Sequence, residues 1–460
     1  MMSPMHYAAH AFWMRWHGYR LDDVFRHYHE FLETQWMSPD EARHRRWLRL
    51  GRLLTHAYQE VPYYREVFDR CGMTPRDVKS EADVRRIPVL TKAAVQEHRA
   101  SLMARNYRGA PLLSASSGGS TGQPTRLVID AERKAAEVGN TWGFHDWTGW
   151  RPGDPLVRLW GSLDAPTFKR RVYRRAARVG INELRLNVHQ MDAAAMDRFA
   201  DLMTTFRPVL FVGYANALFA VARHLVGRGR SLFGALGVIT TAEMLFPAQR
   251  RIIEQAFGCK VFNRYASQEI GQLAGECAHG NLHINHQNVY AEFEGATGPA
   301  LDGHPGTTIV TDLHNYAMPF IRYQIGDLGV PIARRCACGR SMPVLGDVKG
   351  RVSDVIVTPA GRYIFADDIA EIFYPIEAIT QFQVVQERRD ALTVKIVKRP
   401  DVHPTVDAYV LRRLHEAVGE GMQVTLTTVR SIPVLPSGKH RICVSRVEPG
   451  EQPVADVVGR

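Results

Sequence analysis

The stretch SASSGGSTGQPTRL, residues 114–127, is rich in Ser and Gly and leads into an apolar run. Its glycines let backbone N–H groups approach an anion closely, and its hydroxyl groups add hydrogen-bond donors. A mononucleotide-binding P-loop has a Lys directly after its last Gly, but here Gly122 is followed by Gln123 and Pro124. The GxGxxG spacing of dinucleotide-binding loops is also missing. The stretch therefore indicates a phosphate-binding loop that takes its positive charge from another part of the chain, although a Gly/Ser linker is the simpler alternative.

The chain has 460 residues, of which 45% are hydrophobic and 23% charged, and this length predicts more than one domain. No apolar run approaches the roughly 20 residues that a membrane-spanning helix needs. The N-terminal stretch carries Arg and His among its apolar residues, so we interpret it as a helix of the folded protein and expect a cytoplasmic location. The net charge of +11 is concentrated in runs such as 41–52 and 169–180, which would attract a polyphosphate ligand, anionic lipid or nucleic acid. Either run alone is also compatible with a solvated basic face.

The order of predicted elements indicates the fold class. Residues 1–65 have apolar residues at helical spacing, and the segment 61–68 is predicted to be the turn that ends this helical region. From about residue 110 onward, predicted strands alternate with predicted helices. The strands are 155–162, 209–214, 236–241 and 260–265, and the helices are 131–147, 191–206, 215–227 and 246–258. This alternation predicts an α/β fold with a mostly parallel sheet covered by helices, whose ligands bind where strands end in loops.

The last part of the chain predicts a second, smaller domain. Residues 392–398 and 423–429 read as strands, and residues 404–419 read as a helix. We therefore expect a large N-terminal domain over residues 1–349 and a mobile C-terminal α+β domain over residues 350–460. Between about 275 and 340, shorter strands and turn-rich loops surround two cysteines, and we expect a zinc-knuckle insertion there.

Five motifs follow one another in an order that resembles the adenylate-forming ligases, and within them the phenylacetate–CoA ligases and their relatives of capsule biosynthesis. They are SSGGSTGQP (116–124), RYASQE (264–269), PFIRYQIGDLG (319–329), GRVSDVI (350–356) and LPSGKHR (435–441). The N-terminal LLTHAYQEVPYYREVF (53–68) also resembles that branch. The likeness covers essentially the whole chain, and five motifs in the right order make coincidence very unlikely.

The resemblance implies a role for each motif in activating a carboxylate with ATP. Tyr265 would lie against adenine, Glu269 would bind Mg²⁺, and Asp327 would accept hydrogen bonds from the ribose hydroxyl groups. Arg322 precedes Asp327 at the family spacing, and Arg351 corresponds to an arginine near the ribose and phosphate. Taken alone, Glu269 could be a surface carboxylate and Asp327 a turn residue. The residues that would hold the β- and γ-phosphates are Ser116, Ser117, Gly118, Gly119, Ser120, Thr121 and Gly122.

The resemblance also implies that the two domains move relative to one another. Ser353 falls where the family has its hinge, usually an Asp or Lys, and Asp354 would be the hinge if the register slips by one. Lys439 matches the mobile lysine that bridges the carboxylate and the α-phosphate, although a Lys beside a Gly is commonly a solvated turn. Glu243, in ITTAEML (239–245), lies where relatives contact the base and the substrate.

Four residues form a candidate zinc site. Cys277, His283, Cys336 and Cys338 would give a Cys₃His set that closes a tetrahedral shell, which is typical of a structural zinc ion. His279 competes with His283 for the histidine position. Some relatives in the phenylacetate-ligase branch carry zinc at this kind of position. The alternative is four unlinked residues with buried free thiols.

These features predict an enzyme that joins a carboxylic acid to ATP, releases pyrophosphate, and then passes the acyl group to CoA. Basic residues in the 169–180 run are candidates for the CoA phosphates, and aromatic residues are candidates for an aryl or arylacetic acid pocket, unless they are core. The former are Arg170, Arg171, Arg174 and Arg175, and the latter are Trp142, Phe144, Trp147 and Trp160. A ligase that uses an amine or a hydroxyl as acceptor is one alternative, and a basic zinc-containing nucleic-acid binder is another. A homodimer is compatible with the sequence, which does not identify the acid.

Overall fold

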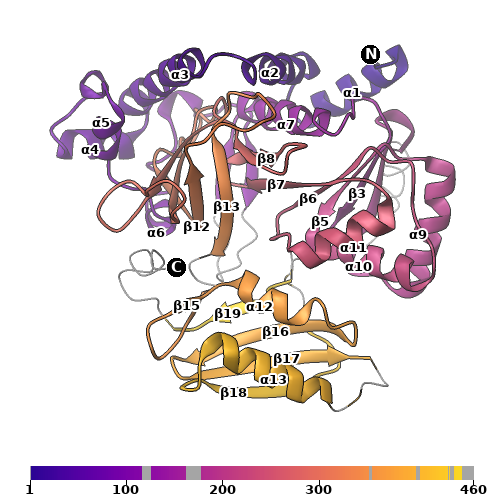
Figure 1. Cartoon of the computed structure of the whole chain (residues 1–460). Coiled ribbons are helices and arrows are strands. Elements are labelled where there is room, and N and C mark those ends of the chain that lie inside the picture. Colours follow the sequence, from indigo (N-terminus) through magenta and orange to yellow (C-terminus); the bar gives the residue numbers. More distant parts are fainter. Residues whose placement is uncertain are drawn as a thin grey trace.

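The computed structural model describes residues 2–116, 126–161, 178–351, 355–399, 403, 405–433, 435 and 440–447, and only the backbone of Ser116 and Arg351. It consists of a large N-terminal domain and a smaller C-terminal domain, which lies at the bottom of the view (Figure 1). Among the described residues, no helix combines the length and the apolar character needed to cross a lipid bilayer.

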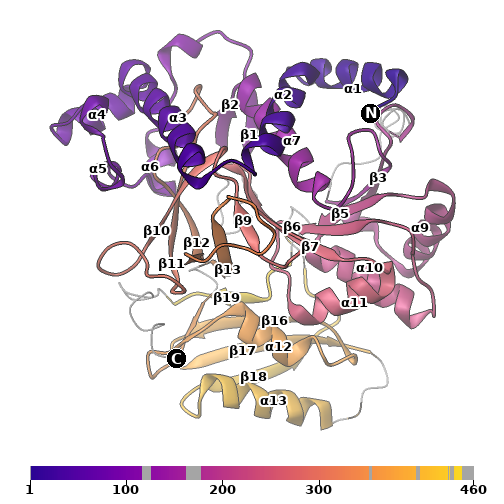
Figure 2. The same cartoon turned by 45° about the horizontal axis from the view of Figure 1, so that its top comes forward.

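The first hundred residues form a helical layer along the side of the large domain away from the C-terminal domain (Figures 1 and 2). Its elements are α1 (Pro4–Trp16), α2 (Leu21–Thr34), α3 (Pro39–Glu60), α4 (Pro62–Arg70), α5 (Glu81–Arg85) and α6 (Lys92–Glu97), with 3₁₀ turns at Pro75–Asp77 and Arg105–Tyr107. The prediction of a turn over 61–68 is wrong, because this segment begins α4. Pro62 occupies the start of α4, where its missing N–H group costs no hydrogen bond.

The large domain is built on an 11-stranded sheet in the order β10-β11-β12-β13-β9-β8-β7-β6-β5-β3-β4. One half is parallel and contains β3 (Leu156–Trp160), β4 (Glu183–Asn187), β5 (Leu210–Tyr214), β6 (Gly237–Thr241) and β7 (Val261–Ser267). The helices along this half are α9 (Ala193–Phe206), α10 (Ala215–Gly227) and α11 (Pro247–Phe257), and a 3₁₀ turn spans Val188–Gln190. This half confirms the predicted alternation of strands and helices.

The other half of the sheet is antiparallel, so the expectation of a mostly parallel sheet holds for one half only. It contains β8 (Gly271–Glu276), β9 (Leu282–Ile284), β10 (Val289–Glu294), β11 (Gly306–Asp312), β12 (Tyr323–Ile332) and β13 (Val344–Arg351). Residues 275–340 therefore form strands of the central sheet and are not an insertion beside it. The connections here are too short for the crossover that parallel pairing requires, so hairpins form instead.

The helix α7 (Ala131–Asp146) packs against α2 at unusually short range. A Cβ atom at Gly139 would lie 2.6 Å from the carbonyl oxygen of Val24, and one at Gly143 would overlap the ring of Phe31. These two glycines are four residues apart and therefore lie on the same side of α7. Before α7, a two-stranded ribbon of β1 (Leu113–Ser116) and β2 (Arg126–Ile129) borders the predicted phosphate loop.

The C-terminal domain has a hydrophobic core of its own, formed almost entirely by residues after 355. Its sheet has the order β18-β17-β16-β19, with a separate β14–β15 pair. The elements are β14 (Ile356–Val357), β15 (Tyr363–Ile364), α12 (Ala366–Phe373), β16 (Ile379–Arg388), β17 (Ala391–Lys398), α13 (Thr405–Val418), β18 (Gln423–Thr428) and β19 (Cys443–Ser445). This observation agrees with the predicted separate α+β domain at the C-terminus.

The packing of α7 on α2 predicts that Gly143→Ala destabilises the protein. The added methyl group must displace the buried Phe31 ring, and overpacking of this kind costs about 1–3 kcal/mol. Denaturant unfolding measures this loss. The matched control is Gly227→Ala at the end of α10, where a Cβ atom meets nothing within 4 Å and should leave the midpoint unchanged or slightly raised. Equal midpoints for the two variants would contradict close packing at Gly143.

Candidate active site

Three residues predicted to bind the nucleoside come from three motifs and meet on neighbouring parts of the sheet. The hydroxyl of Tyr265 on β7 donates a hydrogen bond of 2.5 Å to Oδ2 of Asp327 on β12. Asp327 is in turn the cross-strand partner of Arg351 on β13. Residues separated by up to 86 positions in sequence therefore share one location. This location contains an aromatic ring and a carboxylate that are joined by a hydrogen bond.

Glu269, the predicted Mg²⁺ ligand, lies four residues after Tyr265 in the turn between β7 and β8. It is half-buried. The hydroxyl of Ser267 accepts a hydrogen bond of 3.2 Å from the N–H of Ile270, which tightens the turn. Gly271 ends the turn with φ of +81°, a conformation that favours glycine.

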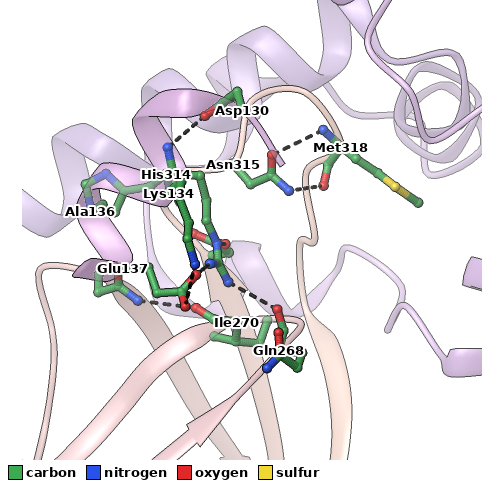
Figure 3. A network of polar contacts seen from close by, with 12 residues as sticks. Asp130, Lys134, Ala136, Glu137, Gln268, Ile270, His314, Asn315 and Met318 are labelled. Atoms are coloured by element: carbon green, nitrogen blue, oxygen red, sulfur yellow. Dashed lines mark hydrogen bonds and ion pairs between the residues drawn. The ribbon is translucent and has the colours of Figure 1, made fainter. Parts of the chain in front are cut away.

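A buried network holds this turn in place from the side of α7 (Figure 3). Arg133 donates through Nη2 to the carbonyl oxygen of Gln268 (3.3 Å) and through Nε to Oδ2 of Asp312 (3.0 Å), and it also pairs with Glu137. Burial by itself would lower the pKa of Arg133, but the carboxylates of Glu137 and Asp312 outweigh it and raise that pKa. The guanidinium therefore stays charged while it bonds to the residue that directly precedes Glu269.

The opposite side of the turn is held by an amide. Nδ2 of Asn288 donates to the carbonyl oxygens of Ile270 (3.3 Å) and Gln272 (3.2 Å). Asn288 is 3% exposed, so these bonds form away from water and hold the backbone firmly. Neither Arg133 nor Asn288 belongs to a motif that the sequence analysis identified, and no local pattern marks them as parts of the site.

Residues around Asp130 connect the predicted phosphate loop to the same region. Asp130 follows β2, and its Oδ1 accepts a hydrogen bond from the N–H of Arg133 at the start of α7, while Oδ2 accepts from the N–H groups of Tyr316 and Ala317. Nδ2 of Asn315 donates to the carbonyl oxygen of Val128 on β2 (3.0 Å). The structure thus anchors the C-terminal side of the loop beside the Arg133 network. The predicted Ser117–Gly122, Ser353 and Lys439 themselves lie outside the described residues.

Glu243 joins the two domains. Its Oε2 accepts a hydrogen bond of 2.9 Å from the N–H of Asn216, and its Oε1 accepts one of 2.9 Å from the N–H of His440. Near these bonds, the hydroxyl of Tyr374 on the C-terminal domain donates to Oδ1 of Asn216 (3.0 Å). Because His440 directly follows Lys439, this contact brings the last predicted motif to the large domain.

Arg322 has partners that differ from its predicted role. Its Nε donates to Glu292 (3.1 Å) and its Nη2 to Glu294 (3.3 Å), while Nη1 donates to the carbonyl oxygens of Arg85 and Ile87. The side chain is 5% exposed. These bonds tie β10 to the segment after α5, so we do not place Arg322 in the nucleotide site. Arg322 lies only five residues before Asp327 in the sequence, but its side chain bonds to Glu292 and Glu294 instead.

Two of the four aromatic residues considered for the acyl pocket, Trp142 and Phe144, are core residues, and the half-buried Trp147 packs against that core. Trp142 packs against Tyr28 and Trp150, and Phe144 packs against Trp147. Trp160 differs, because it lies at the end of β3, 4.6 Å between ring centroids from Tyr214 at the end of β5. Burial and the Glu243 carboxylate raise the pKa of Tyr214 to about 12, so its hydroxyl remains a donor. Tyr214 ends the predicted strand 209–214, but no pattern in the sequence marked it as a site residue.

The predicted cysteine and histidine cluster is confirmed as a geometric group. The ligand atoms of Cys277, His283, Cys336 and Cys338 all lie within 4.8 Å of one another, and His279 is not part of the group. Nδ1 of His283 lies 2.9 Å from the carbonyl oxygen of Met342, to which it can donate, and this leaves Nε2 facing Cys338 at 3.3 Å. Burial by itself would raise the pKa of Cys338. Hydrogen bonds with Arg340 and Cys336, together with the nearby His283 ring, outweigh burial and lower that pKa to about 7.

Comparisons with known proteins agree with the resemblance seen in the motifs. A family model described as the CapK C-terminal domain matches residues 356–446. The phenylacetate–coenzyme A ligase of Thermus thermophilus is 25% identical over 85% of this chain and 94% of its own length. Protein CapK of Staphylococcus aureus is 23% identical over 84% of this chain and 85% of its own length. Over most of its length the chain is therefore similar to the phenylacetate–CoA ligase and CapK branch of the adenylate-forming enzymes. These relatives support its assignment as an AMP-forming ligase.

Solved structures support the same fold for this ligase. A 2-hydroxyisobutyryl-CoA ligase in its postadenylation state is 19% identical, covers 90% of this chain and 91% of that chain, and superposes with a TM-score of 0.73. The same enzyme in its thioesterification state gives a TM-score of 0.58 over the same coverage.

The Arg133 network predicts that Arg133→Lys impairs adenylation without unfolding the ligase. Lysine keeps the charge but cannot reach Asp312, Glu137 and the Gln268 carbonyl together. We expect acid-dependent ATP–pyrophosphate exchange to fall by about 10- to 100-fold and the half-saturating Mg²⁺ concentration to rise. Initial rates over a Mg²⁺ series measure both quantities.

The matched control for this prediction is Lys134→Gln. Lys134 also contacts Glu137, at 3.2 Å, but no hydrogen bond joins it to the described backbone of the turn. Its exchange rate should stay within about twofold of the parent rate. If Arg133→Lys changes exchange no more than Lys134→Gln does, Arg133 does not position the turn.

Proposed function

We propose that this ligase activates an aryl or arylacetic acid with ATP and transfers the acyl group to CoA. In the first step a carboxylate oxygen attacks the α-phosphorus, an acyl-adenylate forms, and pyrophosphate leaves. In the second step the CoA thiol loses its proton and its sulfur attacks the acyl carbon, which gives the thioester and AMP. The basic residues Arg170, Arg171, Arg174 and Arg175, proposed for the CoA phosphates, lie outside the described residues.

The observation that carries this proposal is the convergence of motifs at the junction of the two domains. Tyr265 and Asp327 form one hydrogen-bonded pair, and Arg351 is opposite Asp327 in the register. The contact between Glu243 and the N–H of His440 places His440, the residue after Lys439 in the sequence, beside the loop that follows β6. Ligands of such sheets bind where strands end in loops.

We assign roles to the residues on this basis. Tyr265 would lie against the adenine, Asp327 would accept hydrogen bonds from the ribose hydroxyls, and Arg351 would approach the ribose and phosphate. Glu269, as a hard oxygen ligand, would hold Mg²⁺, which supplies charge neutralisation at the α-phosphate. Ser116 to Gly122 would hold the outer phosphates, and Lys439 would supply the cation at the reacting carboxylate. A rotation at Ser353, or Asp354, would then admit CoA.

The aryl preference rests on two observations. The described end of β3 presents Trp160, and the end of β5 presents Tyr214, so an aromatic pair lies where the acyl group would enter. The curated relatives with the widest coverage include phenylacetate–coenzyme A ligases, which act on an arylacetic acid. An aromatic pair that carries a single hydroxyl suits a flat aryl group.

An amine or a hydroxyl is a second candidate for the acyl acceptor. The family match over residues 356–446 is to the C-terminal domain of CapK, and this domain would face the acceptor after rotation. The first half-reaction and its residues would not differ between the two acceptors. A nucleic-acid binder is not retained, because curated phenylacetate–coenzyme A ligases are similar to this chain over most of its length.

The experiment that tests this function is a pyrophosphate-exchange screen with aryl, arylacetic, fatty and amino acids. Exchange should be highest with an aryl or arylacetic acid, and addition of CoA should give the acyl-CoA by mass. A product with an added amine or alcohol, and none with CoA, would assign the second candidate. No exchange with any carboxylic acid would contradict the proposal as a whole.

Lys439→Ala should depress pyrophosphate exchange by about 100- to 1,000-fold, because the developing charge at the carboxylate loses its cation. The matched control is Lys395→Ala on β17 of the same domain, which should retain the parent rate. Exchange kinetics with the best acid of the screen measure both variants. A Lys439→Ala rate close to that of the control would remove Lys439 from the mechanism.

We further propose that Cys277, His283, Cys336 and Cys338 bind one structural zinc ion. Their ligand atoms lie within 4.8 Å of one another. Nδ1 of His283 lies within hydrogen-bonding distance of the carbonyl oxygen of Met342, and an outer contact of this kind orients a zinc ligand. A closed shell of four protein ligands leaves no position for a substrate. The ion would link β8 and β9 to the segment before β13.

Zinc analysis should find one ion per chain, and a chelator should lower the thermal unfolding midpoint. The double variant Cys336→Ser, Cys338→Ser should lose the ion and unfold at a lower temperature even without chelator. Cys71→Ser is the control, since Cys71 lies outside the cluster. Protein that contains no zinc as purified, takes up none from solution, and is unaffected by chelator would contradict the proposal.

A further inference from the structure

The N-terminal helix α1 has an apolar face that the described protein leaves uncovered. Met5, Phe12 and Trp16 are 63%, 70% and 78% exposed. Their spacing of seven and four residues places them on one side of the helix, and the rings of Phe12 and Trp16 lie 6.4 Å apart between centroids. The buried residues of α1 are His10 and Met14, on the other side. Folding therefore uses one face of α1 and leaves the Met5–Phe12–Trp16 face to water.

An uncovered face of this composition is unusual for a water-exposed helix. Large apolar side chains that cluster on a surface mark a site of contact with a partner or a membrane. At 13 residues, α1 is too short to span a bilayer but long enough to lie along its surface. Trp and Phe are the side chains that such interfacial helices place at the boundary between head groups and acyl chains.

Arg15 is the one Lys or Arg of α1, and it is exposed on one flank of the apolar face. Residues 1–21 contain no Asp or Glu. On the other flank, a Cβ atom at Gly180 would lie 3.1 Å from Cβ of Ala9, so the chain passes along α1 there. Arg178, two residues before Gly180, is exposed as well. Val179, at 63% exposed, adds to the apolar surface beside α1.

We propose that the Met5–Phe12–Trp16 face of α1 docks this ligase peripherally on a membrane that contains anionic lipid. The three apolar side chains would enter the boundary of the head groups, and the arginines at both flanks would contact lipid phosphates. Apolar burial and electrostatic attraction together give the binding that neither gives alone. This proposal does not rest on the acid or the acceptor assigned above.

A second copy of the chain fits the same face less well. A two-fold interface places the same patch on both partners, so it would bring Arg15 and Arg178 of one copy against those of the other. Like charges at such an interface oppose association. A nucleic acid would use the positive charge but leave the apolar side chains in water. An anionic lipid surface is the partner that matches both features.

Vesicle flotation with the full chain tests the proposal. The ligase should float with vesicles of phosphatidylcholine and phosphatidylglycerol, and bind much less to vesicles of phosphatidylcholine alone. Raising the salt concentration should weaken the binding, because exposed charges are then screened. The double variant Phe12→Ser, Trp16→Ser should lower the partition coefficient by more than about tenfold.

The matched control is Trp36→Ser, which removes an aromatic side chain that is 56% exposed but lies between α2 and α3. It should float like the parent chain. Because the substituted side chains are exposed, all variants should unfold at the parent midpoint and retain exchange activity, so loss of flotation reports on the surface alone.

Three outcomes would overturn the proposal. These are absence of flotation with anionic vesicles, equal flotation of the double variant and the parent, and binding that does not depend on lipid charge. If light scattering shows a dimer that the double variant converts to a monomer while flotation is unchanged, the face is an interface between copies instead.

Discussion

A single buried guanidinium connects the parts of the chain on which the candidate active site depends. Arg133 begins α7 and bonds to Asp312 at the end of β11 and to the carbonyl of Gln268 in the turn between β7 and β8. A buried charge is tolerated only when it is paired and hydrogen-bonded, so the three elements must hold their relative positions. Because Arg133 bonds to the residue directly before Glu269, this requirement also fixes the position of Glu269. The Tyr265–Asp327 pair lies on the same two halves of the sheet that Arg133 joins.

The change from parallel to antiparallel pairing at β7 explains where the site lies. On one side of β7, the parallel strands β3 and β5 end at Trp160 and Tyr214, and the loop after β6 carries Glu243. On the other side, antiparallel strands present Asp327 and Arg351. A substrate that contacts both sets must lie across β7. The proposed division places the acyl group toward the parallel half and the nucleoside toward the antiparallel half.

The contact between the two domains combines polar and apolar interactions. The hydrogen bond from the N–H of His440 to Glu243, the bond from Tyr374 to Asn216, and the ion pair of Lys349 with Asp367 are among the polar contacts that span it. The ring of Tyr374 adds apolar contact with Phe219 and Phe246. Because each domain has its own core, such a junction can break and form again without unfolding either part. Rotation of the smaller domain is compatible with this construction, and α1, at the far side of the large domain, would not be disturbed by it.

The sequence by itself indicated the family resemblance, a separate C-terminal domain, the order of elements in the parallel half and the cysteine–histidine group. These features are encoded by residues close together in the chain, or by motifs whose order is preserved. Only the tertiary structure decided that residues 275–340 belong to the sheet, that Arg322 bonds to Glu292 and Glu294, and that Arg133 holds the turn before Glu269. It also decided that His283 and not His279 joins the three cysteines. The physical reason is that hydrogen bonds and strand pairing between distant segments leave no periodic pattern in either segment, so their partners become known only when the chain is folded.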